Sequence, residues 1–377
     1  MKTKKPIYVV LGTRAQTIKM APVMRELESR KIPYTLLYTQ QHKVTIDDLL
    51  ENFEIKTRPV SIINRKEEAK SIKLFAGWLV QIFLLSLNPF SARKVFTQGK
   101  GLVLTHGDTA TTSWSAIYGR IHGQKVMHVE SGLRSFNLMN PFPEEIQRLI
   151  SFRFSHYYVA PNDWALNNLR KYKGLKINSR ANTMYESLTY IIKKKNPKIL
   201  SEIKKEFKLP EKFALVSIHR YENIFKDERF LEILGLLEEI SKVIKLVFVL
   251  HPPTEKVIST KGYYEKLKKN KNIVLVPRQD FEKFAYITDL AEFVITDGGS
   301  NQEELSYLGK PTILFREYTE RTEGLGENVL LSKFDHSLIH EFVRNYRKYS
   351  RRPLQLNENP SKAIVDFVTE IIHNLES

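Results

Sequence analysis

Three carboxylates and two arginines stand close together in residues 128–148, HVESGLRSFNLMNPFPEEIQR. They are Glu130, Glu144, Glu145, Arg134 and Arg148. Glu130 directly follows the apolar run KVMHV, which is typical of a buried strand. Surface loops are often charged, but they rarely place a glutamate directly at the end of a core strand. The pattern therefore indicates carboxylates that are held in place for chemistry.

Polar residues also close the other strand-like runs of the chain. The endings read GTR, HGDT, HVESG, IHRYEN, LHPP, VPRQD and TDGGSNQEE. In open α/β sheets, ligands bind beyond the carboxyl ends of the strands, so these residues are placed to meet around a ligand. The last ending stands between a strand and a helix and has the glycines that suit phosphate binding. Because Asp-Gly-Gly also forms ordinary turns, this motif alone leaves both interpretations open.

Strand-like and helix-like segments alternate along the chain, which predicts an α/β fold with parallel sheets. PIYVVLG, GLVLTHGD and KVMHVESG are strand-like runs in the first half, and FALVSIHR, KLVFVLHPP and EFVITDGG restart the pattern. We expect two Rossmann-like domains facing each other across a cleft, at residues 1–172 and 173–359. A helix at about 360–377 is expected to pack back on the first domain. The lysine-rich residues 169–198 are interpreted as the linker.

The composition narrows the class of protein. With 377 residues, 42% of them hydrophobic and 27% charged, the chain can bury two cores. It contains no cysteine, which excludes thiol nucleophiles, disulfides and thiolate metal sites and fits a reducing compartment. The N-terminus lacks the long apolar run of a signal peptide, so we expect a cytoplasmic protein.

The formal net charge of +17 favours anionic partners. Candidates are nucleic acid, anionic lipid and phosphorylated small molecules. The sequence has no zinc-finger spacing, aromatic RNA-binding signature or isolated basic tail, so we expect no nucleic acid. A lysine-rich solvated surface is the simplest explanation of the charge.

Seven motifs, in a fixed order, resemble those of the non-hydrolysing UDP-N-acetylglucosamine 2-epimerases, which have the two-domain GT-B fold. They are GTRAQTIKMAP, THGDTATT, HVESGLR, PFPEEIQR, HRYEN, TDGGSNQEELSYLGKPT and REYTERTEG. The resemblance implies an enzyme that interconverts UDP-GlcNAc and UDP-ManNAc and supplies ManNAc for cell-envelope polysaccharide. The fold also hosts hydrolysing relatives and glycosyltransferases, so it does not decide the reaction.

The resemblance also implies roles for residues at matching positions. The residues expected to bind the nucleotide and its phosphates are Arg14, Lys19, Gln279, Phe284, Gly298, Gly299, Ser300, Glu304 and Arg321. The residues expected to be catalytic are Asp108, Glu130, Glu144 and His219, together with Arg148. Arg148 stands one helical turn after Glu144 and is expected to orient it.

The implied reaction is an anti elimination of UDP to a 2-acetamidoglucal, followed by re-addition of UDP to the other face. It needs a base for the weakly acidic C2 proton, a group that returns a proton, and cations beside the leaving diphosphate. It requires no metal and no cofactor. The expected partner is a UDP-sugar, and a homodimer is a further expectation.

Simpler interpretations stand beside these roles. Asp108 can merely cap the helix that follows it, and His219 can be an ordinary polar strand end. Either Glu144 or Glu145 can favour a helix N-terminus through the helix dipole, and the register of the motif favours Glu144. His106, His128 and His251 are more often structural than catalytic.

The motifs depart from the family pattern at three places. GTRAQ replaces the usual Gly-Thr-Arg-Pro-Glu, so that Gln16 stands where a glutamate is usual. DGGS replaces Asp-Ser-Gly-Gly. QQHKVT keeps Gln41 and His42 of the family's allosteric motif but has Lys43 and Val44 after them, which puts allosteric activation by UDP-GlcNAc in doubt.

Residues 74–92, LFAGWLVQIFLLSLNPFSA, contain no charge. Pro89 limits a helix to about Leu87, which is short for a membrane span. Two hypotheses stay open: a helix buried in the N-terminal domain, and a helix that contacts anionic membrane through Trp78 and flanking basic residues. The second would suit an alternative function, a GT-B glycosyltransferase acting on a lipid-linked or polysaccharide acceptor at the membrane surface.

Overall fold

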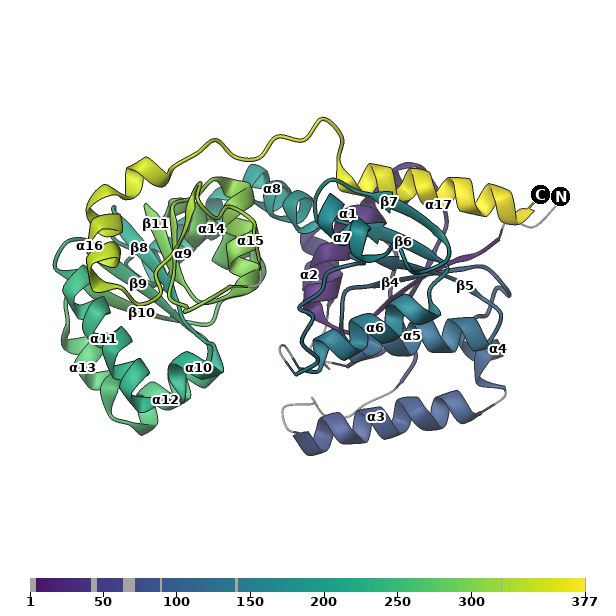
Figure 1. The fold of residues 1–377 in the computed structure, drawn as a ribbon, viewed down its shortest axis with the longest axis horizontal. Coiled ribbons are helices and arrows are strands. Elements are labelled where there is room, and N and C mark those ends of the chain that lie inside the picture. Colours follow the sequence, from purple (N-terminus) through teal and green to yellow (C-terminus); the bar gives the residue numbers. More distant parts are fainter. Residues whose placement is uncertain are drawn as a thin grey trace. The chain divides into compact units, whose positions relative to one another are not determined.

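The computed structural model describes residues 5–41, 46–63, 72–88, 90–139, 142–319 and 321–376. The chain forms two compact units (Figure 1). Unit 1 comprises Met1–Ser187 and Leu356–Ser377, and unit 2 comprises Leu188–Gln355. The sequence-based boundary at 172 falls earlier in the chain.

Unit 1 is built on a parallel sheet of seven strands in the order β3-β2-β1-β4-β5-β6-β7. Its strands are β1 (Ile7–Leu11), β2 (Thr35–Tyr38), β3 (Val60–Ser61), β4 (Leu102–His106), β5 (Lys125–Val129), β6 (Tyr157–Ala160) and β7 (Leu175–Asn178). Its helices are α1 (Arg14–Ser29), α2 (Asp47–Asn52), α3 (Ile72–Leu87), α4 (Ser91–Val95), α5 (Ala110–Ile121), α6 (Glu144–Phe154), α7 (Asp163–Asn168) and α17 (Pro360–Glu376). A further helix, α8 (Met184–Lys194), begins in unit 1 and ends in unit 2.

Unit 2 repeats this architecture with six parallel strands in the order β10-β9-β8-β11-β12-β13. The strands are β8 (Phe213–Ser217), β9 (Lys245–Leu250), β10 (Ile273–Pro277), β11 (Phe293–Thr296), β12 (Thr312–Leu314) and β13 (Val329–Leu331). The helices are α9 (Pro197–Glu206), α10 (Tyr221–Ile224), α11 (Asp227–Ser241), α12 (Pro252–Thr260), α13 (Tyr263–Lys269), α14 (Phe281–Leu290), α15 (Gly299–Leu308) and α16 (His336–Asn345), followed by a 3₁₀ turn at Tyr346–Tyr349. The predicted α/β class with two parallel sheets is confirmed.

The strand order reverses at the centre of each sheet, between β1 and β4 in unit 1 and between β8 and β11 in unit 2. Every residue of these four strands is buried, as expected for apolar runs covered by helices on both faces. At such a reversal the loops after the strands part and leave room for a ligand. The motifs that end in GTR, HGD, HR and TDGG follow these four strands.

The boundary between the units, after Ser187, lies within the lysine-rich residues 169–198 that were interpreted as the linker. They contain β7, which pairs with β6 at the edge of the first sheet, and α8. The lysines in the last turn of α8, Lys193 and Lys194, suit the C-terminal end of the helix dipole. The segment that crosses from unit 1 to unit 2 is therefore a helix rather than a loop.

Glu186 on α8 ties the end of the chain to unit 1. Its carboxylate accepts hydrogen bonds from the backbone N–H of Ser361 at 2.7 Å and from the hydroxyl of Ser361 at 2.5 Å, at the start of α17. Helix α17 in turn packs against α1. Burial raises the pKa of Glu186 to about 7; Glu26 adds to this rise, and the Ser361 hydrogen bonds and Arg25 oppose it.

This raised pKa predicts that unit 1 loses stability as the pH rises from about 5 to about 8. The unfolded chain releases the Glu186 proton near the ordinary pKa of 4.5, whereas the folded chain holds it to about 7. The loss therefore accumulates between these two values and is on the order of 3 kcal/mol above pH 7. The Glu186→Gln variant should lack this loss and be more stable than the native chain at pH 8.

Tryptophan fluorescence during denaturant unfolding measures this effect in unit 1 alone, because Trp78, Trp114 and Trp164 all lie there. The variant Glu202→Gln, at an exposed position of α9, is the control and should follow the native chain at each pH. Parallel stability curves for the native chain and Glu186→Gln would contradict the prediction.

Candidate active site

Glu130 follows β5 in a backbone conformation that side chains usually avoid. Its φ is +62°, in the left-handed region that costs a residue with a Cβ on the order of 1 kcal/mol or more. The neighbouring loop makes room for it, since a Cβ added to Gly107 would lie only 3.2 Å from Oε2 of Glu130. Such strain is concentrated at functional sites, where other contacts hold it in place.

Lys19 and Asn182 hold the Glu130 carboxylate. Nζ of Lys19, on α1, lies 2.6 Å from Oε1, and Nδ2 of Asn182 donates to the same oxygen. The side chains of Lys19 and Glu130 are only 12% and 7% exposed. Screening by solvent is therefore weak, and this is a strong charge-assisted contact. Lys19, expected from the family to contact phosphate, is thus also a partner of Glu130, and Asn182 is a site residue that sequence reasoning missed.

Asp108 follows β4 and receives two hydrogen bonds from Arg148 of α6, at 3.0 Å from Nε and 2.6 Å from Nη2. Nη1 of Arg148 lies 3.4 Å from Glu145. The expected ion pair between Arg148 and Glu144 does not form. Helical spacing placed the two residues within reach, but the guanidinium points to the end of β4, where Asp108 lies.

The neighbouring glutamates of α6 have different surroundings. Glu145 is fully buried and accepts from Nε of Arg134 and, at 3.0 Å, from the backbone N–H of Ser135. Burial alone would raise the pKa of Glu145, but these donors and Arg148 hold it below its ordinary value. Glu145 is therefore an anchor for the loop after β5.

Glu144 is the carboxylate left open to a ligand. It is partly exposed, and its Oε2 is buried without a hydrogen-bond partner among the described residues. A buried acceptor without a partner costs free energy unless a ligand or water supplies a donor. The structure thus distinguishes Glu144 from Glu145 by their surroundings, where the sequence had only the motif register.

Two buried histidines flank these carboxylates. Nε2 of His106 lies 3.5 Å from Oε2 of Glu130, which is too long for a good hydrogen bond. Burial lowers the pKa of both His106 and His128 to about 4, so both rings are neutral at pH 7. His128 has structural contacts, with Nε2 2.7 Å from the carbonyl of Gly107 and Nδ1 3.0 Å from the Ser131 hydroxyl.

Gln16 explains one departure from the family pattern. Its side chain accepts from the backbone N–H of Gly12 at 2.9 Å and donates to the carbonyl of His106 at 2.8 Å. An amide can do both, whereas an ionised glutamate can only accept. Gln16 therefore joins the loops after β1 and β4 without adding a charge.

The other N-terminal motif residues have partners within unit 1. Arg14 forms a two-point ion pair with Asp48 of α2, and an anionic ligand would compete with Asp48 for it. Gln41, the first residue of the expected allosteric motif, is buried and accepts from the hydroxyl of Thr111 at 2.8 Å. His42, Lys43 and Val44 lie outside the described residues.

In unit 2, the buried carboxylate of Asp297 fixes the loop that carries His219. It accepts from the backbone N–H groups of His219 and Arg220, at 3.0 and 2.9 Å, and from Nδ2 of Asn223 at 2.9 Å. Nδ1 of His219 lies 3.4 Å from Asp297. Sequence reasoning missed Asp297, although its place between β11 and the Gly-Gly turn was a usable signal.

His219 lies against the N-terminus of α15. A Cβ added to Gly298 would be 3.0 Å from Cε1 of His219, so the glycine allows this approach. Gly298 is the N-cap of α15, and Gly299 and Ser300 follow with Ser300 exposed. The unsatisfied N–H groups and the dipole of such a helix start attract phosphate.

The remaining expected nucleotide-binding residues also lie in unit 2. Phe284 and Glu304 line one small pocket together with Asn301. Nη1 of Arg321 lies 2.9 Å from Glu303, which neighbours Glu304 on α15. Nε2 of Gln279 donates to the carbonyl of Pro277 at 2.8 Å. The expected residues of unit 2 therefore lie after β10, on α14 and α15, and after β12.

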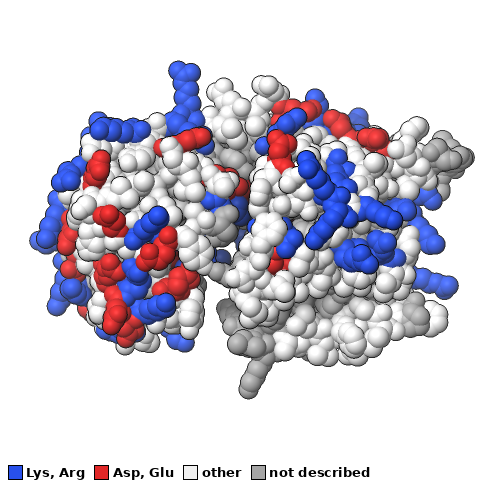
Figure 2. Space-filling model, in the orientation of Figure 1, with Lys and Arg blue, Asp and Glu red and all other residues white. Residues whose placement is uncertain are grey.

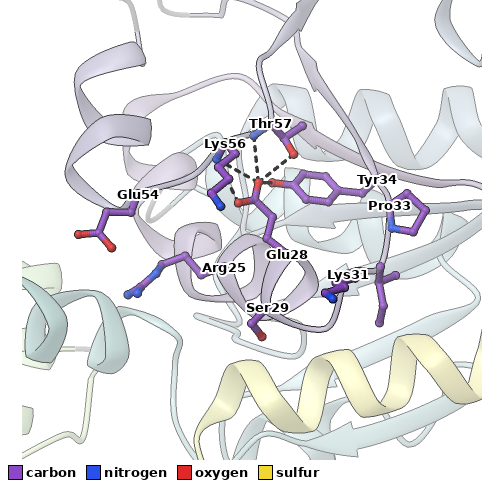
Figure 3. Close-up of a pocket in the computed structure, with 10 residues that line it drawn as sticks. Arg25, Glu28, Ser29, Lys31, Pro33, Tyr34, Glu54, Lys56 and Thr57 are labelled. Carbon is purple, nitrogen blue, oxygen red and sulfur yellow. Dashed lines mark hydrogen bonds between the residues drawn. The ribbon is translucent and has the colours of Figure 1, made fainter.

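A separate pocket of unit 1 is lined by Arg25, Glu28, Tyr34, Lys56 and Thr57, among others (Figure 3). Its central carboxylate, Glu28, accepts from the backbone N–H groups of Lys56 and Thr57 and from two hydroxyls. Burial opposes ionisation, but these donors hold the pKa of Glu28 below its ordinary value. This carboxylate fastens the chain after α2 to α1, and its oxygens are already occupied by these hydrogen-bond donors.

Within the described ranges, no group of three or more His, Asp and Glu side chains is arranged to hold a metal ion.

The comparisons with known proteins all identify the same family. The family model described as UDP-N-acetylglucosamine 2-epimerase matches residues 25–360. Among curated proteins, the UDP-N-acetylglucosamine 2-epimerase of Campylobacter jejuni is 34% identical over 342 residues, covering 86% of this chain and 85% of that protein. The protein of the same name from Methanococcus maripaludis is 32% identical, covering 85% of this chain and 86% of that protein.

Solved structures agree. The UDP-GlcNAc 2-epimerase of Neisseria meningitidis bound to UDP-GlcNAc is similar, with a TM-score of 0.77 and 28% identity, covering 97% of this chain and all (100%) of that one. The Methanocaldococcus jannaschii enzyme in complex with UDP-GlcNAc and UDP has a TM-score of 0.78 and 25% identity, covering 97% of this chain and 99% of that one.

The different surroundings of Glu144 and Glu145 can be tested by replacing each residue in turn. Replacing Glu145 by glutamine leaves the buried charge of Arg134 without its partner, whereas Arg148 keeps Asp108, so the variant should lose roughly 3–5 kcal/mol of stability. Replacing Glu144 by glutamine removes no ion pair and should change the stability by less than about 1 kcal/mol. Tryptophan fluorescence during denaturant unfolding measures both variants. Equal losses of stability in the two variants would refute the distinction between the buried, paired Glu145 and the open Glu144.

Proposed function

Because the chain belongs to the UDP-N-acetylglucosamine 2-epimerase family, we propose that it interconverts UDP-GlcNAc and UDP-ManNAc. The observation that carries this proposal is the strained Glu130, held by Lys19 and Asn182, with Asp108 at the end of the neighbouring strand β4 and Arg148 of α6 bound to Asp108. A reaction that takes a proton from carbon and returns one to it needs carboxylates in different surroundings.

In the proposed first step, a carboxylate takes the C2 proton of the sugar. The C–H electron pair forms the C1=C2 double bond. The C1–O bond to the diphosphate breaks at the same time, and UDP leaves with the electron pair of that C1–O bond. UDP then adds back to C1 while a proton returns to C2 from the opposite face. We assign proton transfer to Glu130 and Glu144, since Glu130 is positioned by fixed donors and Glu144 has an open oxygen.

Unit 2 is proposed to bind the UDP part of the substrate. The N-terminus of α15 and Arg321 suit the diphosphate, and Phe284 and Glu304, which share a pocket, suit the uridine. His219, fixed by Asp297 and adjacent to Gly298, would stabilise the charge that develops as the diphosphate leaves. Lys19 is proposed to serve both Glu130 and the departing phosphate.

A cytoplasmic location belongs to the proposal, and the absence of cysteine from the sequence fits a reducing compartment. The glycosyltransferase alternative rested on the apolar residues 74–92 and on the fold alone. Family membership now favours the epimerase reaction. The hypothesis that Trp78 of α3 contacts a membrane is wrong, because its indole is buried and donates to the carbonyl of Thr39 at 2.9 Å. The described helices include none with both the length and the apolar character needed to cross a bilayer.

Incubation with UDP-GlcNAc in D2O, followed by proton NMR, tests the reaction directly. The expected spectrum contains UDP-ManNAc, and both epimers lose their C2–H signal as solvent deuterium replaces it. Intact C2–H after long incubation would remove the epimerase proposal. Free UDP with free sugar as the main product would indicate hydrolysis instead.

The variants Glu130→Gln and Glu144→Gln test the assigned proton transfers. Each should lower turnover by roughly 10²–10⁴-fold while UDP affinity, measured by calorimetry, changes by no more than a few fold. Glu206→Gln, at an exposed position of α9, is the control and should turn over normally. Normal turnover in either site variant would show that its carboxylate has another role.

A further inference from the structure

Two carboxylates of unit 2 lie around the guanidinium of Arg321. They belong to Glu303 of α15 and to Glu323, which lies between β12 and β13. Nη1 of Arg321 is 2.9 Å from Oε2 of Glu303 and 3.9 Å from Oε1 of Glu323. The other oxygen of Glu303 accepts a hydrogen bond from the hydroxyl of Tyr307 at 3.0 Å. When both carboxylates are ionised, this group of three charged side chains carries an excess of negative charge.

The backbone around Glu323 is fixed against α15. Nε2 of Gln302, near the N-terminal end of that helix, donates to the carbonyls of Arg321 and Glu323 at 3.2 and 3.1 Å. Gly324 has a φ of +72°, and a Cβ added to it would lie 2.7 Å from Oδ1 of Asn328, so this turn requires glycine. Glu323 is therefore held close to the helix whose N-terminus is proposed to bind the diphosphate.

One oxygen of Glu323 has no donor. Its Oε2 is buried and lacks a hydrogen-bond partner within the part of the chain that the structure describes. The side chain is 21% exposed, so solvent screens its charge only in part. Burial raises the pKa of Glu323, and Glu303 adds to this rise, whereas Arg321 and backbone hydrogen bonds oppose it. A proton on this carboxylate would remove the charge and supply a donor, for which phosphate oxygens are suitable acceptors.

The exposed charges of unit 2 are a weaker influence on a bound anion. On the face shown in Figure 2, the Lys and Arg side chains of this unit are interspersed with Asp and Glu side chains. Surface charges of opposite sign offset one another, and salt screens them over about 10 Å at 0.1 M. A diphosphate bound at the start of α15 therefore acts mainly on the partly buried charges of Arg321, Glu303 and Glu323.

We propose that Glu323 takes up a proton when UDP binds beside Arg321, and that this proton offsets the charge of the diphosphate. The inference rests on the proposed function, in which unit 2 binds UDP. Without the proton, two carboxylates and the diphosphate would crowd around the same guanidinium and repel one another.

The proton has its largest effect while UDP is detached from the sugar. UDP leaves with the electron pair of the C1–O bond, so its terminal phosphate gains a negative charge at that step. A neutral Glu323 would lower the repulsion on this phosphate and keep UDP in the site until it adds back to C1.

Isothermal titration calorimetry with UDP at pH 7, in PIPES and in imidazole buffer, counts the protons, because the two buffers differ in their heat of ionisation. The native chain should take up roughly 0.5–1 proton per UDP more than the Glu323→Gln variant. His219 also lies beside the start of α15, but it is present in both chains, so the difference belongs to Glu323. Glu265→Gln makes the same charge change at an exposed position of α13 and should match the native chain.

The pH dependence of UDP affinity is a second measurement. The free chain loses the Glu323 proton at a lower pH than the UDP-bound chain does. Between these two points the affinity of the native chain should fall as the pH rises, by up to about tenfold per pH unit. Glutamine is uncharged, like the protonated carboxyl, so Glu323→Gln should bind UDP roughly tenfold more tightly than the native chain at pH 8.

Two results with the variant would overturn the inference. One is equal proton uptake by the native chain and Glu323→Gln, and the other is weaker UDP binding by Glu323→Gln at pH 8, which would make the ionised Glu323 a positioning residue for Arg321. UDP binding by the native chain without any proton uptake would overturn it with no variant needed. Absence of UDP binding by the native chain would instead overturn the proposed function of unit 2.

Discussion

The pairing of Glu130 with Lys19 and Asn182 is the contact on which the rest of the site depends. It joins the end of β5 to α1 and to the segment before α8, three parts of the chain far apart in sequence. A carboxylate so little exposed is tolerated only when donors satisfy it. The same donors hold Glu130 in its left-handed conformation. Gly107 has no side chain, which lets the loop after β4 lie close to the Glu130 carboxylate that these donors fix.

Charge pairing extends outward from this centre in a regular way. Asp108 is matched by Arg148, and Glu145 is matched by Arg134 and Arg148. In unit 2, backbone N–H groups rather than cations satisfy the buried Asp297, which leaves His219 beside the helix start. Neutral groups serve where another charge would disturb this balance: His106 and His128 stay uncharged at pH 7, and Gln16 stands where a glutamate is usual.

The fold and the position of the site followed from the sequence because parallel strands present their carboxyl ends at one edge. The runs ending in HGD and HVE in unit 1, and in IHR and TDGG in unit 2, were recognisable as strands, and within each unit the sheet brings their last residues to one edge. The partners of Glu130 and His219 were not predictable in the same way. Asn182 and Asp297 are 52 and 78 residues from the groups that they hold, and no local pattern reports such distances. Helical spacing likewise paired Arg148 with the wrong glutamate, and composition did not show which side of Trp78 faced the core.

The backbone conformation of Glu130 has a consequence for how this chain can change over generations. Glycine, asparagine or aspartate at this position would relieve the local strain, so mutations that abolish the carboxylate contact are also ones that the backbone accepts most readily. Relief of the backbone strain alone would favour a residue other than glutamate at position 130. A glutamate that persists there marks a lineage in which the reaction is still under selection, whereas glycine or asparagine would mark a paralogue that has kept the fold and left the chemistry.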